Sequence, residues 1–201
     1  MTDRRATLGR SLPEVVIACV VAGLEAVQLR EKDLPAGEAH DLARELREAT
    51  RAGRARLLIN DRVDIALATR ADGVHLPASG LPPGVARRLL PPGSLVGQST
   101  HSLEEARRAA EEGVDYVVFG PVYDTPSKRS FGPPRGLRDL EAVAGQAGCP
   151  VIAIGGVTAT RIPDLKEAGA AGVAVIRALL ESPDPGQATA ELVAACQGAW
   201  R

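Results

Sequence analysis

The chain has 201 residues, a formal net charge of −1 and 2% aromatic residues. A charge near zero and few aromatic side chains argue against binding to nucleic acid or to a charged membrane surface, and no apolar run is long enough to cross a bilayer. The length suits one sizeable domain, so residues 1–201 are expected to form a single domain.

The hydrophobic pattern predicts helices that alternate with short buried strands. The predicted helices cover residues 13–21, 38–52, 63–68, 85–90, 102–112, 137–147, 158–169 and 188–196. The predicted strands cover residues 24–29, 57–59, 73–76, 95–97, 116–119, 151–154 and 172–176. Ser11 and Ser102 each precede a glutamate by three residues, the spacing of a capping box, and Thr158 or Thr160 is expected to cap its helix.

This alternation is typical of repeated βα units around a parallel sheet. Seven predicted strands precede eight predicted helices, so a first strand is missing, and its stub is expected around Thr2 and Asp3. The eightfold count predicts an α/β fold, a (β/α)8 TIM barrel with a truncated first strand. The alternative is a doubly wound open sheet. Polar residues or glycines follow nearly every strand, which favours the barrel, because a barrel gathers all strand ends around one site.

The three cysteines, Cys19, Cys149 and Cys196, stand among apolar residues without metal-binding or redox spacing. They are therefore expected to be buried thiols. No apolar segment follows the charged start MTDRR closely, so a signal peptide is not expected. These features predict a cytoplasmic protein.

A polar loop follows the predicted strand 116–119. The chain breaks at Gly120-Pro121 and then carries Thr125, Ser127 and Lys128. Two hydroxyls and a lysine in one short loop suit an anionic ligand. Glycine, proline, serine and threonine are also ordinary turn residues, so the loop alone leaves both readings open.

Three side chains near the end of the predicted strand 24–29 stand two residues apart: Gln28, Arg30 and Lys32. An extended chain would place all three on one face. The alternative is that Arg30 and Lys32 form weak surface pairs with the acids beside them, Glu31 and Asp33.

Two further strand ends suit phosphate chemistry. Asn60 and Asp61 follow a buried strand, and a single aspartate can hold Mg²⁺ together with phosphate oxygens and water. Asp61 could instead simply cap the following helix. Gly155 and Gly156 precede a helix and leave backbone N–H groups available to a phosphate.

Several segments resemble one family in order along nearly the whole chain. They are QLREK at 28–32, INDRVDIAL at 59–67, ADGVHLP at 71–77, GQSTHSLEEA at 97–106, DYVVFGPVYDTPSK at 115–128, and AIGGVT with AGAAGVAVI within 153–176. They are similar to the thiamine phosphate synthase superfamily, which includes thiazole tautomerases of the TenI type. The resemblance implies a TIM barrel, Mg²⁺ as cofactor, and a transferase that joins hydroxymethylpyrimidine diphosphate to thiazole phosphate and releases pyrophosphate.

The resemblance also implies roles for individual residues. The pyrimidine diphosphate would be bound by Gln28, Arg30, Lys32 and Asn60, and Mg²⁺ by Asp61. The leaving pyrophosphate would lie near Ser99 and Lys128, which with Arg30 form the expected catalytic set. The thiazole phosphate would be bound by Thr125, Ser127, Gly156, Ile176 and Arg177.

Three positions depart from the family pattern. Gly80 stands where the synthase usually carries a second Mg²⁺-binding aspartate, so this loop is closer to the tautomerase group. Pro121 stands where the best-known tautomerase has its acid/base histidine, as in the synthase. Arg177 stands where a small residue is usual beside the phosphate, and it either adds charge there or points outward.

The expected function is therefore thiamine phosphate synthesis from two small-molecule substrates, without nucleic acid or membrane partners. One alternative is a thiazole tautomerase that needs no Mg²⁺ and would use His75 or His101 as its acid/base. A second alternative is a non-catalytic protein that binds thiamine intermediates. The oligomeric state stays open, and a homo-oligomer is compatible with the sequence.

Overall fold

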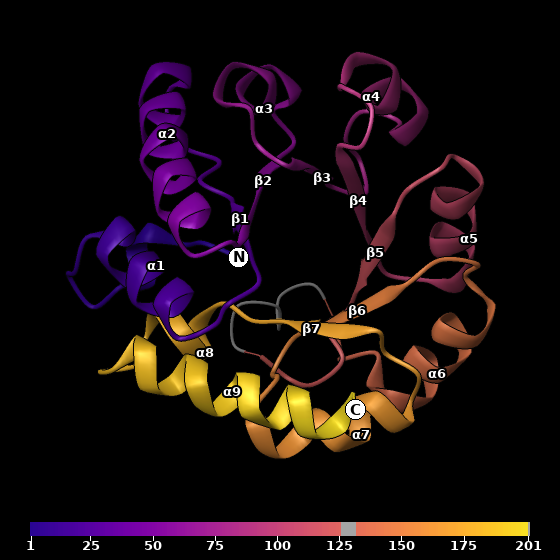
Figure 1. Ribbon diagram of the computed structural model, residues 1–201. Helices are drawn as coiled ribbons and strands as arrows, with labels where there is room; N and C mark the ends of the chain where they lie inside the picture. Colours follow the sequence, from indigo (N-terminus) through magenta and orange to yellow (C-terminus); the bar gives the residue numbers. More distant parts are fainter. Residues whose placement is uncertain (126–131, 201) are drawn as a thin grey trace. The chain divides into compact units, whose positions relative to one another are not determined.

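Figure 1 shows the computed structural model of the chain, in which helices and strands alternate along the sequence. The structure describes residues 1–125 and 132–200, so Ser127 and Lys128 lie outside the described residues. The chain divides into two compact units. The first comprises Met1–His75, Arg88–Leu95 and Ile176–Val193, and the second comprises Leu76–Arg87, Val96–Val175 and Ala194–Arg201.

Seven strands follow one another in the sheet in the order of the sequence. They are β1 (Ala26–Leu29), β2 (Arg56–Asn60), β3 (Gly73–Leu76), β4 (Leu95–Thr100), β5 (Tyr116–Phe119), β6 (Val151–Ile154) and β7 (Gly172–Ala174). The pairs β1–β2 and β5–β6 are parallel, with Val27 opposite Leu57 and Val118 opposite Ile152. A barrel of βα units keeps this sequential order, whereas a doubly wound sheet reverses it at a switch point. The predicted barrel class is confirmed.

The stub expected around Thr2 and Asp3 forms no strand. The Thr2 N–H donates one hydrogen bond of 2.9 Å to the Gln28 carbonyl in β1. The chain then turns into the short 3-10 helix η1 (Arg4–Ala6), whose first turn is capped when the Asp3 carboxylate accepts the Arg5 N–H. The predicted stub is therefore wrong, and this segment is joined to β1 by the Thr2 bond without forming a strand.

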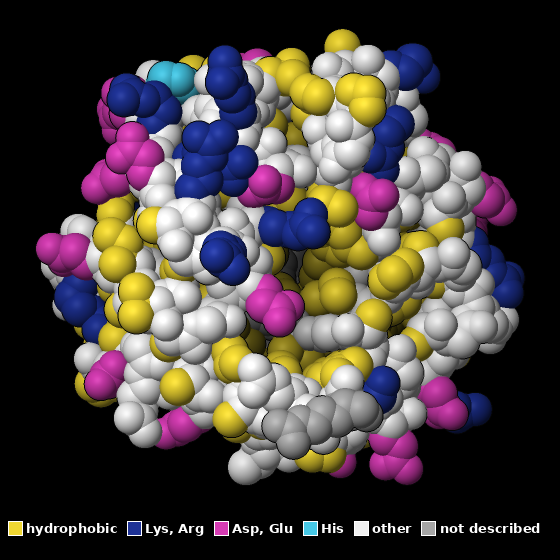
Figure 2. Space-filling view, viewed as in Figure 1, with side chains coloured by type: hydrophobic (Ala, Val, Ile, Leu, Met, Phe, Trp, Pro, Cys, Tyr) yellow, Lys and Arg dark blue, Asp and Glu magenta, His cyan; other side chains and the backbone are white. Residues whose placement is uncertain are grey.

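In the first unit, α1 (Leu12–Val21) packs against α2 (Ala36–Ala52), and α2 packs against α3 (Val63–Thr69). This unit also contains α8 (Arg177–Leu180) and the first part of α9 (Pro185–Ala199). The buried residues of α2 are Ala43, Leu46 and Thr50, and none of its charged residues is buried. Lys and Arg side chains gather over α2 in the space-filling view (Figure 2).

In each unit, an aspartate accepts a hydrogen bond from the backbone of a neighbouring strand. Asp72 accepts two hydrogen bonds from Arg47 of α2, at 2.5 and 3.1 Å, and one of 2.7 Å from the Leu57 N–H. In the second unit, Asp115 likewise accepts the Val96 N–H at 2.7 Å. Each carboxylate thus accepts the amide of the second residue of a neighbouring strand.

The second unit contains α5 (Leu103–Glu111), α6 (Gly136–Gln146), η3 (Ala159–Arg161) and α7 (Ile162–Glu167). Here α5 packs against α6, and α6 packs against α7. The helix α4 (Pro83–Leu89) lies between β3 and β4 in the sequence. No helix among the described residues is both long and apolar enough to span a membrane.

The predicted helix starts are partly confirmed. The Ser11 and Ser102 hydroxyls accept the N–H groups of Glu14 and Glu105, as the capping-box spacing predicts. The prediction for Thr158 and Thr160 is wrong, because their hydroxyls lie 3.0 Å apart and bond to each other, and a 3-10 turn precedes α7 instead.

The predicted end of the strand 95–97 is also wrong. β4 continues through Gln98, Ser99 and Thr100, because the parallel pairing with β5 continues until Thr100 lies opposite Phe119. Ser99 is therefore held in the sheet rather than in a loop.

Candidate functional site

The end of β1 presents two cations that have no acidic partner in the described part of the chain. The guanidinium of Arg30 and the ammonium of Lys32 form no ion pair with any described residue. The acids beside them, Glu31 and Asp33, pair instead with Arg4 and Arg5 of the N-terminal segment. The surface pairs considered from the sequence are therefore not formed, and both cations remain available to an anionic ligand.

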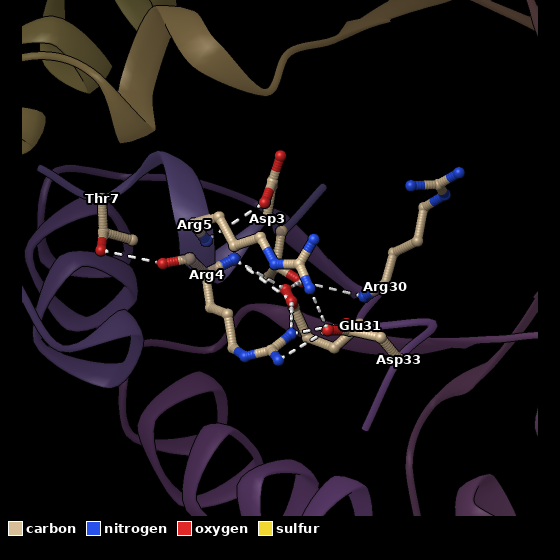
Figure 3. A network of polar contacts seen from close by, with 8 residues as sticks. Asp3, Arg4, Arg5, Thr7, Arg30, Glu31 and Asp33 are labelled. Carbon is tan, nitrogen blue, oxygen red and sulfur yellow. Dashed lines mark hydrogen bonds and ion pairs between the residues drawn. The ribbon is translucent and has the colours of Figure 1, made fainter. Parts of the chain in front are cut away.

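Figure 3 shows this N-terminal network and the Arg30 side chain extending away from it. The Glu31 carboxylate, whose side chain is 3% exposed, accepts the Thr2 hydroxyl at 2.7 Å, the Arg4 N–H at 3.1 Å and the Arg4 guanidinium at 3.1 Å. The same Thr2 hydroxyl oxygen accepts the Arg30 N–H at 2.9 Å. Hydrogen bonds from Arg4 also hold the pKa of Asp33 well below its usual value. The network thus fixes the backbone on both sides of Arg30.

The end of β2 presents an acid that also lacks a partner. Asp61 adopts a left-handed backbone conformation with φ of 67°, which is uncommon for a residue with a side chain. Its N–H donates to the His75 carbonyl at 2.9 Å, but its carboxylate forms no hydrogen bond or ion pair with a described residue. The residue at the helix cap is Arg62, whose guanidinium bonds Asp64. The alternative of Asp61 as a helix cap is therefore wrong.

A pocket of about 250 Å³ lies at the ends of β1 and β2. Its lining includes Lys32, Asn60 and Asp61, together with apolar side chains such as Leu29 and Ile65. Gln28 and Arg30 are not part of this lining. β1 ends at Leu29, so strand alternation no longer governs the residues beyond it, and Lys32 enters the pocket beside Leu29.

Gln28 and His75 are the buried polar side chains of this unit's strands. The Gln28 amide oxygen is buried and has no hydrogen-bond partner among the described residues. An acceptor left in that state costs free energy unless a ligand supplies a donor. Burial, with a smaller contribution from the Arg30 charge, lowers the pKa of His75 to about 3. His75 is therefore neutral at physiological pH.

In the second unit, the loop after β5 lies against the glycine turn after β6. Val122 and Tyr123 donate their N–H groups to Ile154 and Gly155 at 2.8 and 3.1 Å. A Cβ atom added to Gly156 would come within 2.8 Å of the Asp124 carbonyl and of the Tyr123 side chain. This close approach admits only glycine there, and it brings Thr125 into the neighbourhood of the predicted phosphate-binding turn.

The Gly155-Gly156 turn has the backbone geometry of an anion site. Its φ angles are 102° and 63°, and the N–H groups of Gly156 and Val157 donate to no described residue. Successive unpaired N–H groups in a turn of this kind favour an anion.

β4 of the same unit carries Ser99, and His101 follows it. The His101 Nδ1 lies 2.7 Å from the Gly120 carbonyl, so Nδ1 carries the proton and donates it. The His101 N–H donates to the Glu105 carboxylate at 2.6 Å. His101 thus joins the ends of β4 and β5, and one of its two ring nitrogens is already engaged.

The remaining predicted residues are placed as follows. Ile176 precedes α8 in the first unit, and the Arg177 guanidinium lies 3.4 Å from Glu181 on the same helix. Arg177 is thus engaged in a half-exposed pair rather than free. Gly80 closes a turn by donating its N–H to the Pro77 carbonyl at 2.9 Å.

The side chains of these residues show whether they could hold Mg²⁺. The described residues contain no group of three or more His, Cys, Asp or Glu side chains that could hold a metal ion by themselves. Two acidic residues, Glu31 and Asp61, line the pocket with Asn60 and Lys32. The Glu31 carboxylate is engaged by Thr2 and Arg4, which leaves that of Asp61 for a metal ion. This set fits an ion that arrives with a diphosphate, because Mg²⁺ commonly takes one or two carboxylates and completes its shell with phosphate oxygens and water.

Two features of the site were not predicted from the sequence. Arg161 contacts both Gly156 and Tyr123, and Glu31 anchors the segment that carries Arg30 and Lys32. In an extended chain Glu31 would point to the face opposite that of Arg30 and Lys32, and this is a weak indication of its role in the sequence. Nothing in the sequence indicates the role of Arg161, because an arginine near the start of a helix usually has a solvated side chain.

Comparisons with known proteins agree along nearly the whole chain. The family model described as thiamine monophosphate synthase matches residues 1–179. A Geobacter sulfurreducens protein with the provisional name thiamine-phosphate synthase is 49% identical over 194 residues, which cover 96% of this chain and 91% of that protein. The thiamine-phosphate synthase of Roseiflexus castenholzii is 44% identical over 192 residues, which cover 96% of this chain and 84% of that protein.

A solved structure gives the same result. The thiamine phosphate pyrophosphorylase from Pyrococcus furiosus superimposes with a TM-score of 0.90 at 34% identity, and the match covers 100% of this chain and 95% of that one. The (β/α) order of the strands, the matched family model and these relatives agree, and the chain belongs to the thiamine monophosphate synthase family.

Proposed function

We propose that this protein is a thiamine phosphate synthase, a transferase that joins hydroxymethylpyrimidine diphosphate to thiazole phosphate. The observation that carries the proposal is the pocket at the ends of β1 and β2, where Lys32 and Asp61 both lack partners among the described residues. A cation and a carboxylate that line one pocket without partners among the described residues suit a diphosphate that carries its own Mg²⁺. The names of the relatives support the same activity.

In this reaction the bond between the pyrimidine methylene carbon and the diphosphate oxygen breaks, and its electron pair leaves with pyrophosphate. The thiazole nitrogen supplies the electron pair of the new bond to the same carbon. Negative charge thus grows on the leaving group, and cations already in place stabilise it most effectively. We assign this role to Arg30 and Lys32, together with Lys128 and Ser99. Lys128 lies outside the described residues.

Gln28 is proposed to recognise the pyrimidine. Its buried amide oxygen lacks a donor among the described residues, and the amino group of the pyrimidine would supply one. A site built to accept such a hydrogen bond rejects analogues without the donor, because the oxygen would then stay buried and unpaired.

Asp61 and Asn60 are the residues that would hold Mg²⁺ on the diphosphate. When bound, Mg²⁺ would neutralise charge on the diphosphate oxygens. The Asp61 carboxylate has no partner among the described residues, and its left-handed backbone is of a kind typical of functional sites.

The thiazole phosphate is proposed to bind at the Gly155-Gly156 turn of the second unit, and the roles of Thr125, Ser127, Ile176 and Arg177 stay predictions. The unpaired N–H groups of the turn support this assignment. The finer assignments made from the sequence, a cytoplasmic location and a homo-oligomer, stay predictions.

A second candidate function is the thiazole tautomerase, and the turn at Pro77–Gly80 favours it, because Gly80 replaces the second carboxylate of the synthase. Its acid/base would have to be His75 or His101. Burial keeps His75 neutral and lowers its pKa to about 3, and His101 has one ring nitrogen engaged by Gly120. His75 therefore does not suit proton transfer near neutral pH. The bond from Nδ1 to Gly120 orients the His101 ring and leaves Nε2 without a partner among the described residues, so His101 is the candidate acid/base of this alternative.

The test uses the purified protein with both substrate sets, with and without EDTA. Formation of thiamine phosphate that EDTA abolishes supports the proposal. Isomerisation of the thiazole carboxylate that is insensitive to EDTA, without thiamine phosphate, would replace it with the tautomerase, and binding without turnover would replace it with the non-catalytic alternative.

A matched pair of variants tests the assigned cation. Lys32→Ala should lower kcat about 100-fold, because it removes charge stabilisation of the leaving group. Arg51→Ala removes an exposed cation from α2 and should leave kcat within about twofold. Equal effects of the two substitutions would contradict the role of Lys32.

A further inference from the structure

Arg161 holds the glycine turn from the side of the helix. It is the last residue of η3, and its Nη1 donates a hydrogen bond of 2.5 Å to the Gly156 carbonyl. Its guanidinium carbon also lies 4.4 Å from the centroid of the Tyr123 ring, within the range of a cation–π contact. One planar side chain therefore contacts both the turn after β6 and the loop after β5.

The hydrogen bond to Gly156 fixes the direction of one peptide group. In a planar trans peptide, the carbonyl of Gly156 and the N–H of Val157 point in opposite directions. Because Arg161 engages the carbonyl, the Val157 N–H is turned away from Arg161, and it donates to no described residue. Without this bond, the turn could rotate so that a carbonyl oxygen faced the ligand and repelled an anion.

The contact with Tyr123 fixes the second loop against the first. The Tyr123 N–H already donates to Gly155, and its Cβ lies where a side chain on Gly156 would have to go. Thr125 follows two residues later. The position of this loop therefore depends on the same side chain that orients the glycine turn.

We propose that Arg161 is a positioning residue for the phosphate group of the thiazole substrate. It acts through the peptide group after Gly156 and through the ring of Tyr123 rather than by contact with the reacting atoms. This inference rests on the proposed function for the identity of the phosphate, but its binding test does not require turnover.

The test compares Arg161→Met, Arg161→Lys and Arg161→Gln with a control, Arg107→Met. Arg107 makes a similar contact elsewhere in the same unit, because its guanidinium donates to the carbonyl and side-chain oxygens of Gln146 on the surface. Calorimetry measures binding of thiazole phosphate, and steady-state kinetics measures KM for each substrate separately. Thermal unfolding is recorded for every variant.

Arg161→Met should weaken thiazole-phosphate binding about tenfold, and KM for the pyrimidine diphosphate should change less than about twofold. Arg161→Lys should recover about half of the loss on a logarithmic scale, because it keeps the cation and one donor but loses the planar fork. Arg161→Gln, without the cation, should resemble Arg161→Met. Arg107→Met should change neither binding nor KM.

Unchanged thiazole-phosphate binding in Arg161→Met would overturn the inference. So would a loss shared equally by both substrates and accompanied by a lower melting temperature, since a general loss of structure would explain it. If the wild-type protein binds thiazole phosphate but forms no thiamine phosphate, the proposed function fails while the binding comparison still decides the role of Arg161. A wild-type protein that does not bind thiazole phosphate at all would overturn both.

Discussion

The buried His75 should make the protein lose stability as the pH falls below about 6.5, the ordinary pKa of histidine. Burial lowers the pKa of His75 in the folded state to about 3. Between these two values the unfolded chain binds a proton at this residue and the folded chain does not. Because stability rises with pH wherever the unfolded state binds more protons, the free energy of unfolding must decrease on acidification through this range.

The magnitude follows from the two pKa values. At pH 7.5 the unfolded histidine is about one-tenth protonated, and at pH 5 it is almost fully protonated, so protonation favours the unfolded state by about 2 kcal/mol at pH 5. Burial also lowers the pKa of the Met1 amine, to about 6. This amine adds a second fall in stability over the same pH range, so the contribution of His75 is the difference between the wild type and a His75 variant.

The assay is urea unfolding followed by circular dichroism at pH 7.5 and pH 5. The wild-type free energy of unfolding should fall by more than about 2 kcal/mol between the two, because both groups contribute. His75→Asn removes one of the two titrating groups and should reduce this fall by about 2 kcal/mol, even if it lowers stability at pH 7.5. His40→Asn changes an exposed histidine and should leave the dependence as in the wild type. Equal wild-type stability at the two pH values, or an unchanged dependence in His75→Asn, would refute the reasoning.

Three further predictions concern the anionic site. Glu31→Gln should lower the free energy of unfolding by about 2 kcal/mol, because it weakens charge-assisted hydrogen bonds to a side chain that is 3% exposed. Asp33→Asn, in an exposed pair, should lower it much less in the same urea titration. Asp61→Asn should raise the Mg²⁺ concentration needed for half-maximal activity about tenfold or more, measured by Mg²⁺ titration at fixed diphosphate; an unchanged requirement would remove Asp61 from the metal site. Gly80→Asp should lower the Mg²⁺ concentration needed for half-maximal activity. Backbone strain should not obscure the result, since Gly80 is not among the described glycines with positive φ. A higher Mg²⁺ requirement would contradict the idea that an acid is missing at this position.

The sequence by itself determined the alternation of strands and helices, two of the helix caps and the class of the fold. These features follow from local periodicity and from short spacings, such as Ser11 with Glu14 and Ser102 with Glu105. The sequence also located most candidate residues at strand ends, because polar side chains immediately after apolar runs are visible without any distance information.

Only the tertiary structure decided which of those residues are free. Glu31 and Asp33 could have neutralised their neighbours, but Arg4 and Arg5, more than 25 positions away in the sequence, pair with them and leave Arg30 and Lys32 available. Such pairings depend on distances across the fold, which local patterns do not encode.

The roles of Asp61 and Arg161 also could not be predicted from local sequence patterns. The left-handed backbone of Asp61 comes from its position between the end of β2 and the His75 carbonyl, and this distinguishes a free carboxylate from a helix cap. Arg161 acquires its place only because Gly156 and Tyr123 come together beside it. Residue types and spacings are properties of the chain, whereas the pairing and burial of a charged group are decided by neighbours that the fold brings from elsewhere.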